Sequence, residues 1–318
     1  MRITNNMMSN NYLSALNKSL ERQNTIQEQL SDGKAIHRPS DDPIKTIRSL
    51  RFNSSLAINE QFTQNVSDSL SWMETTDGAM SDLSTVMIRI KELAVSADNT
   101  KPTDALKAIA QEMDQLINQA VQIGNTKIGD RYVFAGQMDS TPPFERKQIK
   151  DPNSNMVKDV VVYNGDVNKI SMLIKPGVAN PAEDSVNLTG DEVFGPITYT
   201  YGQPTMDIFS NLIGIKEELA KPNPDLNWVL NTGLGNIDAA HNSQLKMHTQ
   251  VGARMATYEM AKNMMESNYV TISNDISANE DLDIAAAIID QKTSENVYKS
   301  ALAVGARILP PSLVDFLR

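Results

Sequence analysis

The chain has 318 residues, of which 40% are hydrophobic, 5% aromatic and 21% charged, with a formal net charge of -10 at pH 7. This acidic balance argues against nucleic acid as a partner, because phosphate binding draws on a surplus of Lys and Arg. Cysteine is absent, which excludes disulfides, thiolate nucleophiles and Cys-ligated zinc. The low aromatic content is typical of long helical assemblies with an aliphatic core.

The N-terminal segment has the pattern of a weak amphipathic helix. No apolar stretch of the secretion-signal kind precedes it, and no run reaches transmembrane length, so we expect neither Sec-type secretion nor a membrane partner. Its apolar stripe consists of Leu13, Leu16, Leu20 and Leu30. Gln23 and Gln27 interrupt that stripe. So weak a seam does not offset the ordering entropy of the segment, which we therefore predict to be mobile until a partner covers it. An ordinary helix packed on its own domain is the alternative.

A breaker cluster at residues 31–34 ends this first helix. Asp42 is then expected to cap a second helix, with Pro43 in the first turn, where its missing N–H costs nothing. No strong break follows until about Asp98. The pattern predicts a helix of roughly 80 Å at 1.5 Å per residue, which must lie along other long helices.

A third helix is predicted after a turn at residues 99–102. Thr103 or Asp104 is expected to cap it, and its apolar stripe follows a heptad pattern. The stripe consists of Leu106, Ile109, Met113, Leu116, Ala120 and Ile123. This is the clearest coiled-coil signal in the chain.

The middle of the chain predicts a small inserted β domain at residues 137–205. Half of the 14 prolines fall there and exclude long helices. Val157–Tyr163 and Val167–Ile174 read as strands of one hairpin, joined through Asn164-Gly165-Asp166. Further strands are expected at Asp191–Phe194 and Ile197–Tyr201.

Helical patterns return at residues 206–219, at about 226–277 and in a last helix that begins near Asp281. The last helix has two adjacent apolar stripes, a face wider than one partner helix covers, so we expect more than one neighbour. One stripe consists of Val297, Ala301, Val304 and Ile308, and the other of Tyr298, Leu302, Gly305 and Leu309. Beyond Pro310-Pro311 lies an apolar tail that contains Leu313 and Phe316.

Catalytic chemistry is not indicated. His241 and His248 lie seven residues apart without a placed carboxylate, which is a weak metal site. Asp281 and Asp283 precede an apolar helix and are better explained as caps than as a hydrolytic pair. No phosphate-binding loop, dinucleotide fingerprint or nucleophile elbow is present. We therefore expect no catalytic residue, no metal and no cofactor.

Six short motifs lie along the chain at Met1–Thr4, Leu30–Lys34, Arg38–Pro43, Gly129–Gly136, Val251–Arg254 and Ser312–Leu317. In this order they resemble the motifs of the flagellin family, and in particular those of its hook-associated members. Pro310-Pro311 departs from the smooth last helix of that family. The resemblance covers both flanks of the chain and omits the insert.

The resemblance, together with the helical patterns, implies a mainly α fold: a flagellin-like long helical coiled-coil rod formed by both chain ends, with a small inserted β domain. In this division, residues 1–36 and 283–318 form a terminal assembly domain that makes the inner layer of a tube. Residues 37–136 and 206–282 form the long-helix rod, and residues 137–205 form the outer β domain.

The resemblance also implies a structural protein of the bacterial flagellum that joins hook to filament by ring assembly. Such a protein is extracellular and crosses the flagellar type III export apparatus without a cleaved signal peptide. Its implied partners are copies of itself, a neighbouring hook-associated protein, flagellin, and an export chaperone on the C-terminal helix. The predicted assembly interface is Leu13, Leu16, Leu20, Leu30, Val297, Ala301, Val304, Ile308, Leu309, Leu313 and Phe316.

Three other functions stay open at this point. The chain could be a flagellin-type filament subunit, a secreted adhesin on a helical stalk, or a hydrolase whose site lies within the insert. The assembly reading leads because the amphipathic pattern at both ends needs an explanation that the last two do not supply.

Overall fold

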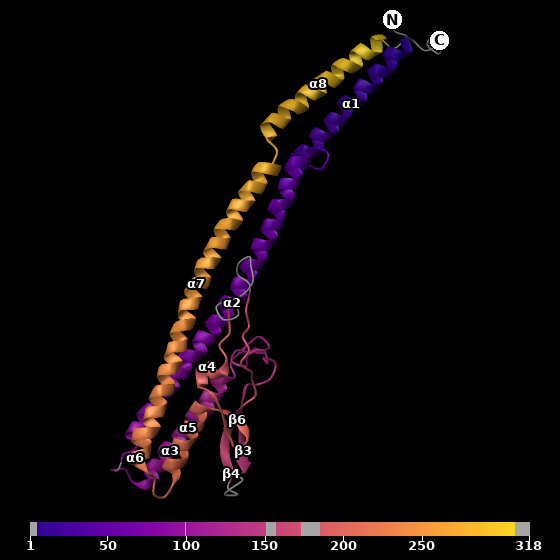
Figure 1. Cartoon of the computed structure of the whole chain (residues 1–318). Coiled ribbons are helices and arrows are strands. Elements are labelled where there is room, and N and C mark those ends of the chain that lie inside the picture. Colours follow the sequence, from indigo (N-terminus) through magenta and orange to yellow (C-terminus); the bar gives the residue numbers. More distant parts are fainter. Residues whose placement is uncertain (1–4, 99, 151–156, 173–184, 309–318) are drawn as a thin grey trace. The chain divides into compact units, whose positions relative to one another are not determined.

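The computed structural model describes residues 5–98, 100–150, 157–172 and 185–308. The chain divides into two compact units. Residues 1–60 and 267–318 form one, here called the terminal unit, and residues 61–266 form the other, here called the central unit. Two long helices, α2 (Pro43–Ser96) and α7 (Leu234–Glu280), each pass from one unit to the other (Figure 1).

The terminal unit is entirely helical in its described part. It contains α1 (Asn5–Asp32), the start of α2, the end of α7, and α8 (Ile284–Ile308). α1 and α8 lie side by side (Figure 1). The predicted end of the first helix and the predicted start of the second are confirmed. Gly33 follows α1 with φ 73°, and Asp42 Oδ1 accepts 3.0 Å hydrogen bonds from the backbone N–H groups of Ile44 and Lys45.

The central unit packs four helical segments. These are the remainder of α2, α3 (Thr103–Gly124), α5 (Asp207–Ala220) and the start of α7. The predicted cap at Thr103 or Asp104 is wrong, because Pro102 occupies the N-cap position without a side-chain hydrogen bond. The predicted helix from Leu226 is not regular either. It begins as α6 (Leu226–Trp228) and a π-helical turn, η1 (Val229–Gly233), before α7 starts.

A four-stranded antiparallel sheet has the order β3-β4-β6-β5. Its strands are β3 (Phe144–Lys150), β4 (Val157–Tyr163), β5 (Ile197–Thr200) and β6 (Gln203–Met206). A separate two-residue hairpin joins β1 (Lys127–Ile128) to β2 (Arg131–Tyr132). The predicted strands at Val157–Tyr163 and Ile197–Tyr201 are thus confirmed as β4 and β5, the latter one residue shorter.

Two strand predictions are wrong. The partner of β4 is β3, with Val160 opposite Lys147, and the described part of the predicted strand at residues 167–174 forms only an isolated bridge between Ser171 and Ser185. Residues 191–194 belong to a short helix, α4 (Gly190–Phe194). The physical reason is local hydrogen bonding: the Thr189 N–H donates to Glu192 Oε2 at 3.3 Å and the Glu192 N–H donates to the Thr189 carbonyl oxygen at 3.2 Å, which starts a helical turn.

The buried side chains of the central unit form one hydrophobic cluster that extends from α2 and α3 to the sheet and α5. Phe144 and Phe194 meet at its centre with ring centroids 4.6 Å apart. A Cβ atom at Gly124 would lie 2.6 Å from the Phe144 ring, so α3 approaches the sheet closely because this position is glycine. The strands therefore share their core with the long helices.

A half-buried ionic cluster holds the sheet against α3 and α5. Asp159 of β4 accepts hydrogen bonds from Arg146 at 2.7 Å and from Lys216 at 2.8 Å. Asp114 of α3 contacts the same two cations, with Lys216 Nζ 3.3 Å away. Burial raises the pKa of Asp159, but the hydrogen bonds and charges of Lys216 and Arg146 outweigh it and lower the pKa to about 2.

This cluster predicts acid destabilisation of the central unit. Because the folded-state pKa of Asp159 is depressed, its contribution is complete above pH 4 and is lost as the pH falls toward 2. We expect a loss of about 1–2 kcal/mol in the free energy of unfolding over this range. Urea unfolding of wild type and of Asp159→Asn at several pH values measures it. An unchanged acid dependence in Asp159→Asn would contradict the assignment.

Candidate assembly surface

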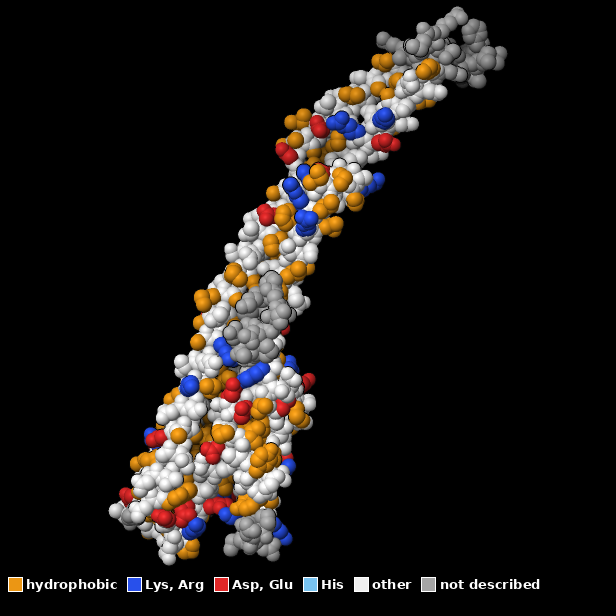
Figure 2. Space-filling model, in the orientation of Figure 1, with side chains coloured by type: hydrophobic (Ala, Val, Ile, Leu, Met, Phe, Trp, Pro, Cys, Tyr) orange, Lys and Arg blue, Asp and Glu red, His pale blue; other side chains and the backbone are white. Residues whose placement is uncertain are grey.

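The apolar side chains of the terminal unit mostly face solvent. Among the described residues of this unit, Ile26 and Ala287 are the buried hydrophobic ones, whereas every member of the hydrophobic cluster lies in the central unit. Figure 2 shows hydrophobic side chains on the surface along the helices of this unit. The large exposed ones are Met7, Leu13, Ile44, Ile47, Leu50, Ile58, Tyr269, Val270, Ile284, Ile288, Ile289, Val297, Leu302 and Val304. So extended an apolar surface is typical of an interaction site.

The α8 side of the seam between α1 and α8 is built from small and polar groups. Ala287 and Ser294 are buried seven residues apart on α8, and Gly305 is buried eleven residues further on, which fits a heptad pattern of alternating steps of three and four. Tyr12 donates a 2.8 Å hydrogen bond to the carbonyl oxygen of Ala301. A Cβ atom at Gly305 would lie 2.1 Å from the Tyr12 hydroxyl oxygen, so this glycine makes room for the tyrosine. The bulky aliphatic side chains of α8 are left outside the seam.

The predicted interface residues divide into two groups. Leu16, Leu20, Leu30 and Ala301 are half-buried, whereas Leu13, Val297 and Val304 are exposed. Ile308 lies at the end of α8. The predicted residues Leu309, Leu313 and Phe316 lie outside the described residues. The exposed group is available to a neighbouring molecule, and the half-buried group already contributes to pairing of the chain ends.

The two connecting segments of the terminal unit join by backbone pairing. Lys34 and Asp281 form an antiparallel bridge. The N–H of Ala35 donates to the Glu280 carbonyl oxygen at 2.7 Å, and the N–H of Leu282 donates to the Gly33 carbonyl oxygen at 2.8 Å. These bonds tie the turn after α1 to the turn before α8, so α1 and α8 are joined at this end of the pair.

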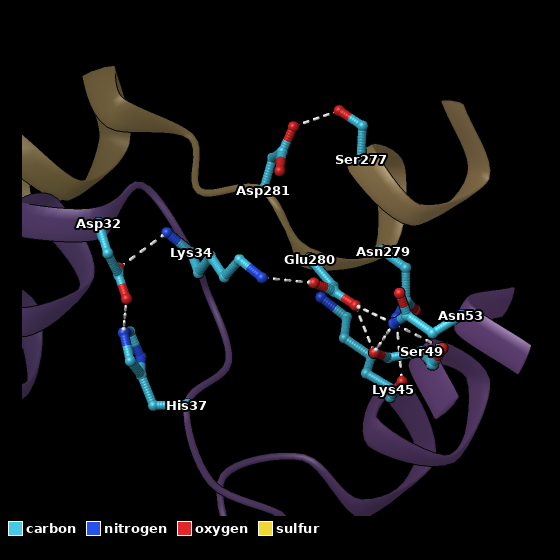
Figure 3. Close-up of polar contacts among 10 residues, drawn as sticks. All are labelled: Asp32, Lys34, His37, Lys45, Ser49, Asn53, Ser277, Asn279, Glu280 and Asp281. Atoms are coloured by element: carbon cyan, nitrogen blue, oxygen red, sulfur yellow. Dashed lines mark hydrogen bonds and ion pairs between the residues drawn. The ribbon is translucent and has the colours of Figure 1, made fainter. Parts of the chain in front are cut away.

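Glu280 is the polar centre of this joint (Figure 3). Its carboxylate is buried and accepts from the Ser49 hydroxyl, from Lys34 Nζ at 3.1 Å and from Asn53 Nδ2 at 3.4 Å. The hydrogen bond from Ser49 lowers the pKa of Glu280, burial opposes this shift, and the bond and charge of Lys34 add to the lowering. Beside it, Asn279 donates to the Lys45 carbonyl oxygen at 2.9 Å.

Sequence reasoning missed both Glu280 and the exposed start of α2. Ile44, Ile47 and Leu50 recur at a spacing of three, which is a visible helical stripe. Which way that stripe faces becomes clear only once Ser49 and Asn53 are known to contact Glu280. For Glu280 itself, no sequence signal marks a carboxylate that binds partners more than 200 positions away.

The histidines considered in the sequence have local partners. His241 Nε2 lies 3.0 Å from the Ser84 hydroxyl, and His248 Nε2 lies 2.8 Å from Asp77 Oδ1. Among the described residues, no three His, Cys, Asp or Glu side chains are placed to hold a metal ion. Searching the same residues, we find no helix with the length and hydropathy needed to cross a membrane.

Comparisons with known proteins agree with this architecture. Residues 3–139 match the family model of the bacterial flagellin N-terminal helical region. Flagellar hook-associated protein 3 of Escherichia coli is 27% identical over 200 residues, which cover 62% of this chain and 58% of that protein. A flagellin of Clostridium tyrobutyricum is 32% identical over 127 residues, which cover 40% of this chain and 34% of that protein. The matched stretch is thus less than two thirds of either relative.

The fold is that of solved junction proteins. The flagellar junction protein FlgL of Legionella pneumophila superimposes with a TM-score of 0.55 at 18% sequence identity, covering 74% of this chain and all of that one. The long helices with a small antiparallel sheet are therefore confirmed as a flagellin-like fold. The chain resembles flagellar hook-associated protein 3, as its motifs predicted.

The joint at Glu280 generates a prediction about the start of α2. Glu280→Ala removes the acceptor of the Ser49 hydroxyl and one acceptor of the Asn53 amide, which also donates to the Ser49 carbonyl oxygen, a loss of about 1–3 kcal/mol. We expect amide hydrogen exchange in residues 44–53 to accelerate about tenfold or more. Glu295→Ala removes a half-buried α8 carboxylate whose ion-pair partners among the described residues are Lys292 and Lys299, and it serves as the matched control. Equal exchange rates in the two variants would contradict the role of Glu280.

Proposed function

We propose that this chain is a structural protein of the bacterial flagellum that joins hook to filament by assembling into a ring through its terminal unit. The observation that carries the proposal is the separation between a central unit with its own core and a terminal unit whose large apolar side chains face solvent. The chain acts by assembly and not by catalysis.

The energetics favour a neighbour over solvent. Full burial of a Val, Leu or Ile side chain is worth about 1.5–3 kcal/mol, and Val304, 52% exposed, has roughly half of that left to gain. The exposed aliphatic side chains of α8 together supply several kcal/mol, which offsets the ordering of the helix and the loss of free motion on association.

The charge distribution also supports assembly through the terminal unit. This unit carries 12 basic and 13 acidic residues, whereas the central unit carries 17 basic and 26 acidic residues. The net charge of -10 therefore lies almost entirely on the central unit. Near-neutral terminal units repel one another little when they meet, and the acidic central units keep the protein soluble.

In the proposed mechanism, residues 1–36 and 283–318 are mobile in the free subunit and become ordered when neighbours cover them. The weak α1–α8 seam supports this order of events, because small side chains bury little area. Leu309, Leu313 and Phe316 complete the proposed interface. Residues 37–136 with 206–282 are the proposed rod, and residues 137–205 the proposed outer domain.

The proposed partners follow from a junction position. Copies of the chain form the ring, and the ring contacts another hook-associated protein on one side and flagellin on the other. Before assembly, an export chaperone covers the C-terminal helix, whose exposed Val297, Leu302 and Val304 need protection from aggregation. The site of action is extracellular, and export does not involve a cleaved signal peptide.

A flagellin-type filament subunit is the second candidate. The 32% identity to a flagellin, against 27% to hook-associated protein 3, favours it, but that flagellin match covers 40% of this chain and the hook-associated match covers 62%. The two candidates share the terminal helices and differ in where the protein lies along the flagellum. No described contact favours an adhesin or a hydrolase in the insert.

Val304→Asp tests both the proposed assembly surface and the proposed position of the protein along the flagellum. A charge at a position that a neighbouring molecule would cover has no partner there. We therefore expect at least about tenfold less protein in isolated flagella, and poor motility. Immunogold labelling measures the effect: wild type should give a band at the hook end, and the variant should give none. Staining of wild type along the whole filament would instead establish the filament subunit.

Val157→Asp is the matched control for this substitution. Val157 begins β4 in the central unit and is 57% exposed, close to the 52% of Val304. The same chemical change at equal exposure but outside the terminal unit should leave the hook-end band intact. Loss of the band in both variants would point to a general folding or export defect and remove the support for the terminal surface.

Ordering on assembly has its own test. Amide hydrogen exchange should show little protection in residues 5–32 and 284–308 of the monomer, and strong protection of the same amides in isolated flagella. The central unit serves as the internal reference, because its core is expected to be protected in both states. Strong protection of both ends in the dilute monomer would rule out the proposed switch.

A further inference from the structure

The start of α2 presents a basic, apolar surface, here called the α2 surface and defined as Ile44, Ile47, Arg48, Leu50 and Arg51. Its three aliphatic side chains are 67%, 53% and 66% exposed. No acidic residue occurs between Pro43 and Asn59. Neither arginine forms an ion pair with a described residue. Exposed aliphatic groups beside unpaired guanidinium groups are the composition expected at a protein interface.

The inner face of this helix is already occupied. Ser49 and Asn53 bind Glu280, and the Lys45 carbonyl oxygen accepts from Asn279. At 3.6 residues per turn, Ile44 and Ile47 lie on the face opposite Ser49 and Asn53, and Leu50 lies at the edge of that face. The α2 surface is therefore free to meet another molecule while the joint at Glu280 stays intact.

A surface of opposite charge lies on α7 in the central unit. It is here called the α7 surface and consists of Glu259, Met260, Met264 and Glu266. Met260 and Met264 are 65% and 55% exposed, and neither glutamate forms an ion pair with a described residue. Flexible thioethers adapt to a partner of irregular shape. Lys262 lies between the two glutamates in the sequence, so the segment keeps one net negative charge beside its apolar side chains, which the α2 surface lacks.

We propose that the α2 surface of one copy docks on the α7 surface of a second copy. Ile44 to Arg51 and Glu259 to Glu266 are both seven-residue steps, about 10 Å of helix each, so the two surfaces match in length. Pairing of like surfaces would bring arginine against arginine or glutamate against glutamate, which costs several kcal/mol. Charge complementarity therefore selects the unlike pair.

An unlike pair has a consequence for assembly. A contact between two different surfaces leaves one α2 surface and one α7 surface free on every dimer, so further copies add until a ring closes or a helical array grows. A contact between two like surfaces would stop at a dimer. The inference rests on the proposed function and identifies the contact through which further copies would join the ring.

Cysteine cross-linking tests the pair cleanly, because the native chain has no cysteine. Leu50→Cys and Met264→Cys are made in separate full-length chains, with Ile47→Cys and Met260→Cys as second choices at a different register. Isolated flagella that contain both variants are treated with a bismaleimide. We expect a linked dimer when the two variants are mixed, at least about tenfold more than with either variant alone.

Tyr199→Cys is the matched control. Tyr199 is 76% exposed on β5, outside both surfaces, so it should react with a soluble maleimide without forming linked dimers with Leu50→Cys. Equal amounts of linked dimer from Leu50→Cys alone, or none from any of the four mixed pairs in flagella that contain the protein, would overturn the inference. In that second case a normal band at the hook end would leave the proposed function standing.

Charge reversal provides an independent readout. Arg48→Glu with Arg51→Glu, and Glu259→Lys with Glu266→Lys, should each reduce incorporation into flagella about tenfold or more, while all four changes in one chain should restore it. Failure of the combined chain to recover would overturn the pairing. Binding of phosphatidylglycerol vesicles that depends on Arg48 and Arg51, without linked dimers, would replace the second copy by an anionic lipid surface.

Discussion

The rest of the structure depends on how apolar burial is divided between the two units. A folded unit is stable when the apolar area it removes from water offsets the conformational entropy it loses. The central unit meets this condition through one cluster shared by α2, α3, α5, α7 and the sheet. The terminal unit, with Ile26 and Ala287 as its described buried hydrophobic residues, is left with bulky side chains in solvent. Under the proposed function, neighbouring molecules supply the burial that this unit lacks.

Polar contacts perform a different task in each unit. In the central unit, Arg146 and Lys216 clamp Asp114 and Asp159 and fix the sheet on the helices. In the terminal unit, Glu280 fixes the point where both chain ends begin. Neither network adds much free energy compared with apolar burial, but each sets a position. The joint thus orients surfaces whose binding energy comes from aliphatic side chains.

Local chemistry made some features predictable from sequence. Asp42 and Pro43 mark the start of α2 because a cap and a first-turn proline act within a few residues. The strand partner of β4 could not be found this way, since β3 is rich in charge and Arg146 is satisfied by Asp114 and Asp159 from elsewhere. Within the candidate assembly surface, the exposed Val297 and Val304 were predicted from the sequence, whereas Glu280 and Ile44 could be recognised only from the fold.

The composition of the α1–α8 seam explains why the chain ends do not satisfy each other. A heptad seam of leucine and valine would have drawn the bulky side chains of α8 inward and closed the terminal unit as an independent hairpin. Ala287, Ser294 and Gly305 occupy those positions instead, and Tyr12 fits only because Gly305 has no side chain. The pair is thus held in register by a weak contact, and Val297, Leu302 and Val304 remain outside. A subunit that stored this apolar area within itself would have none left to offer a neighbour.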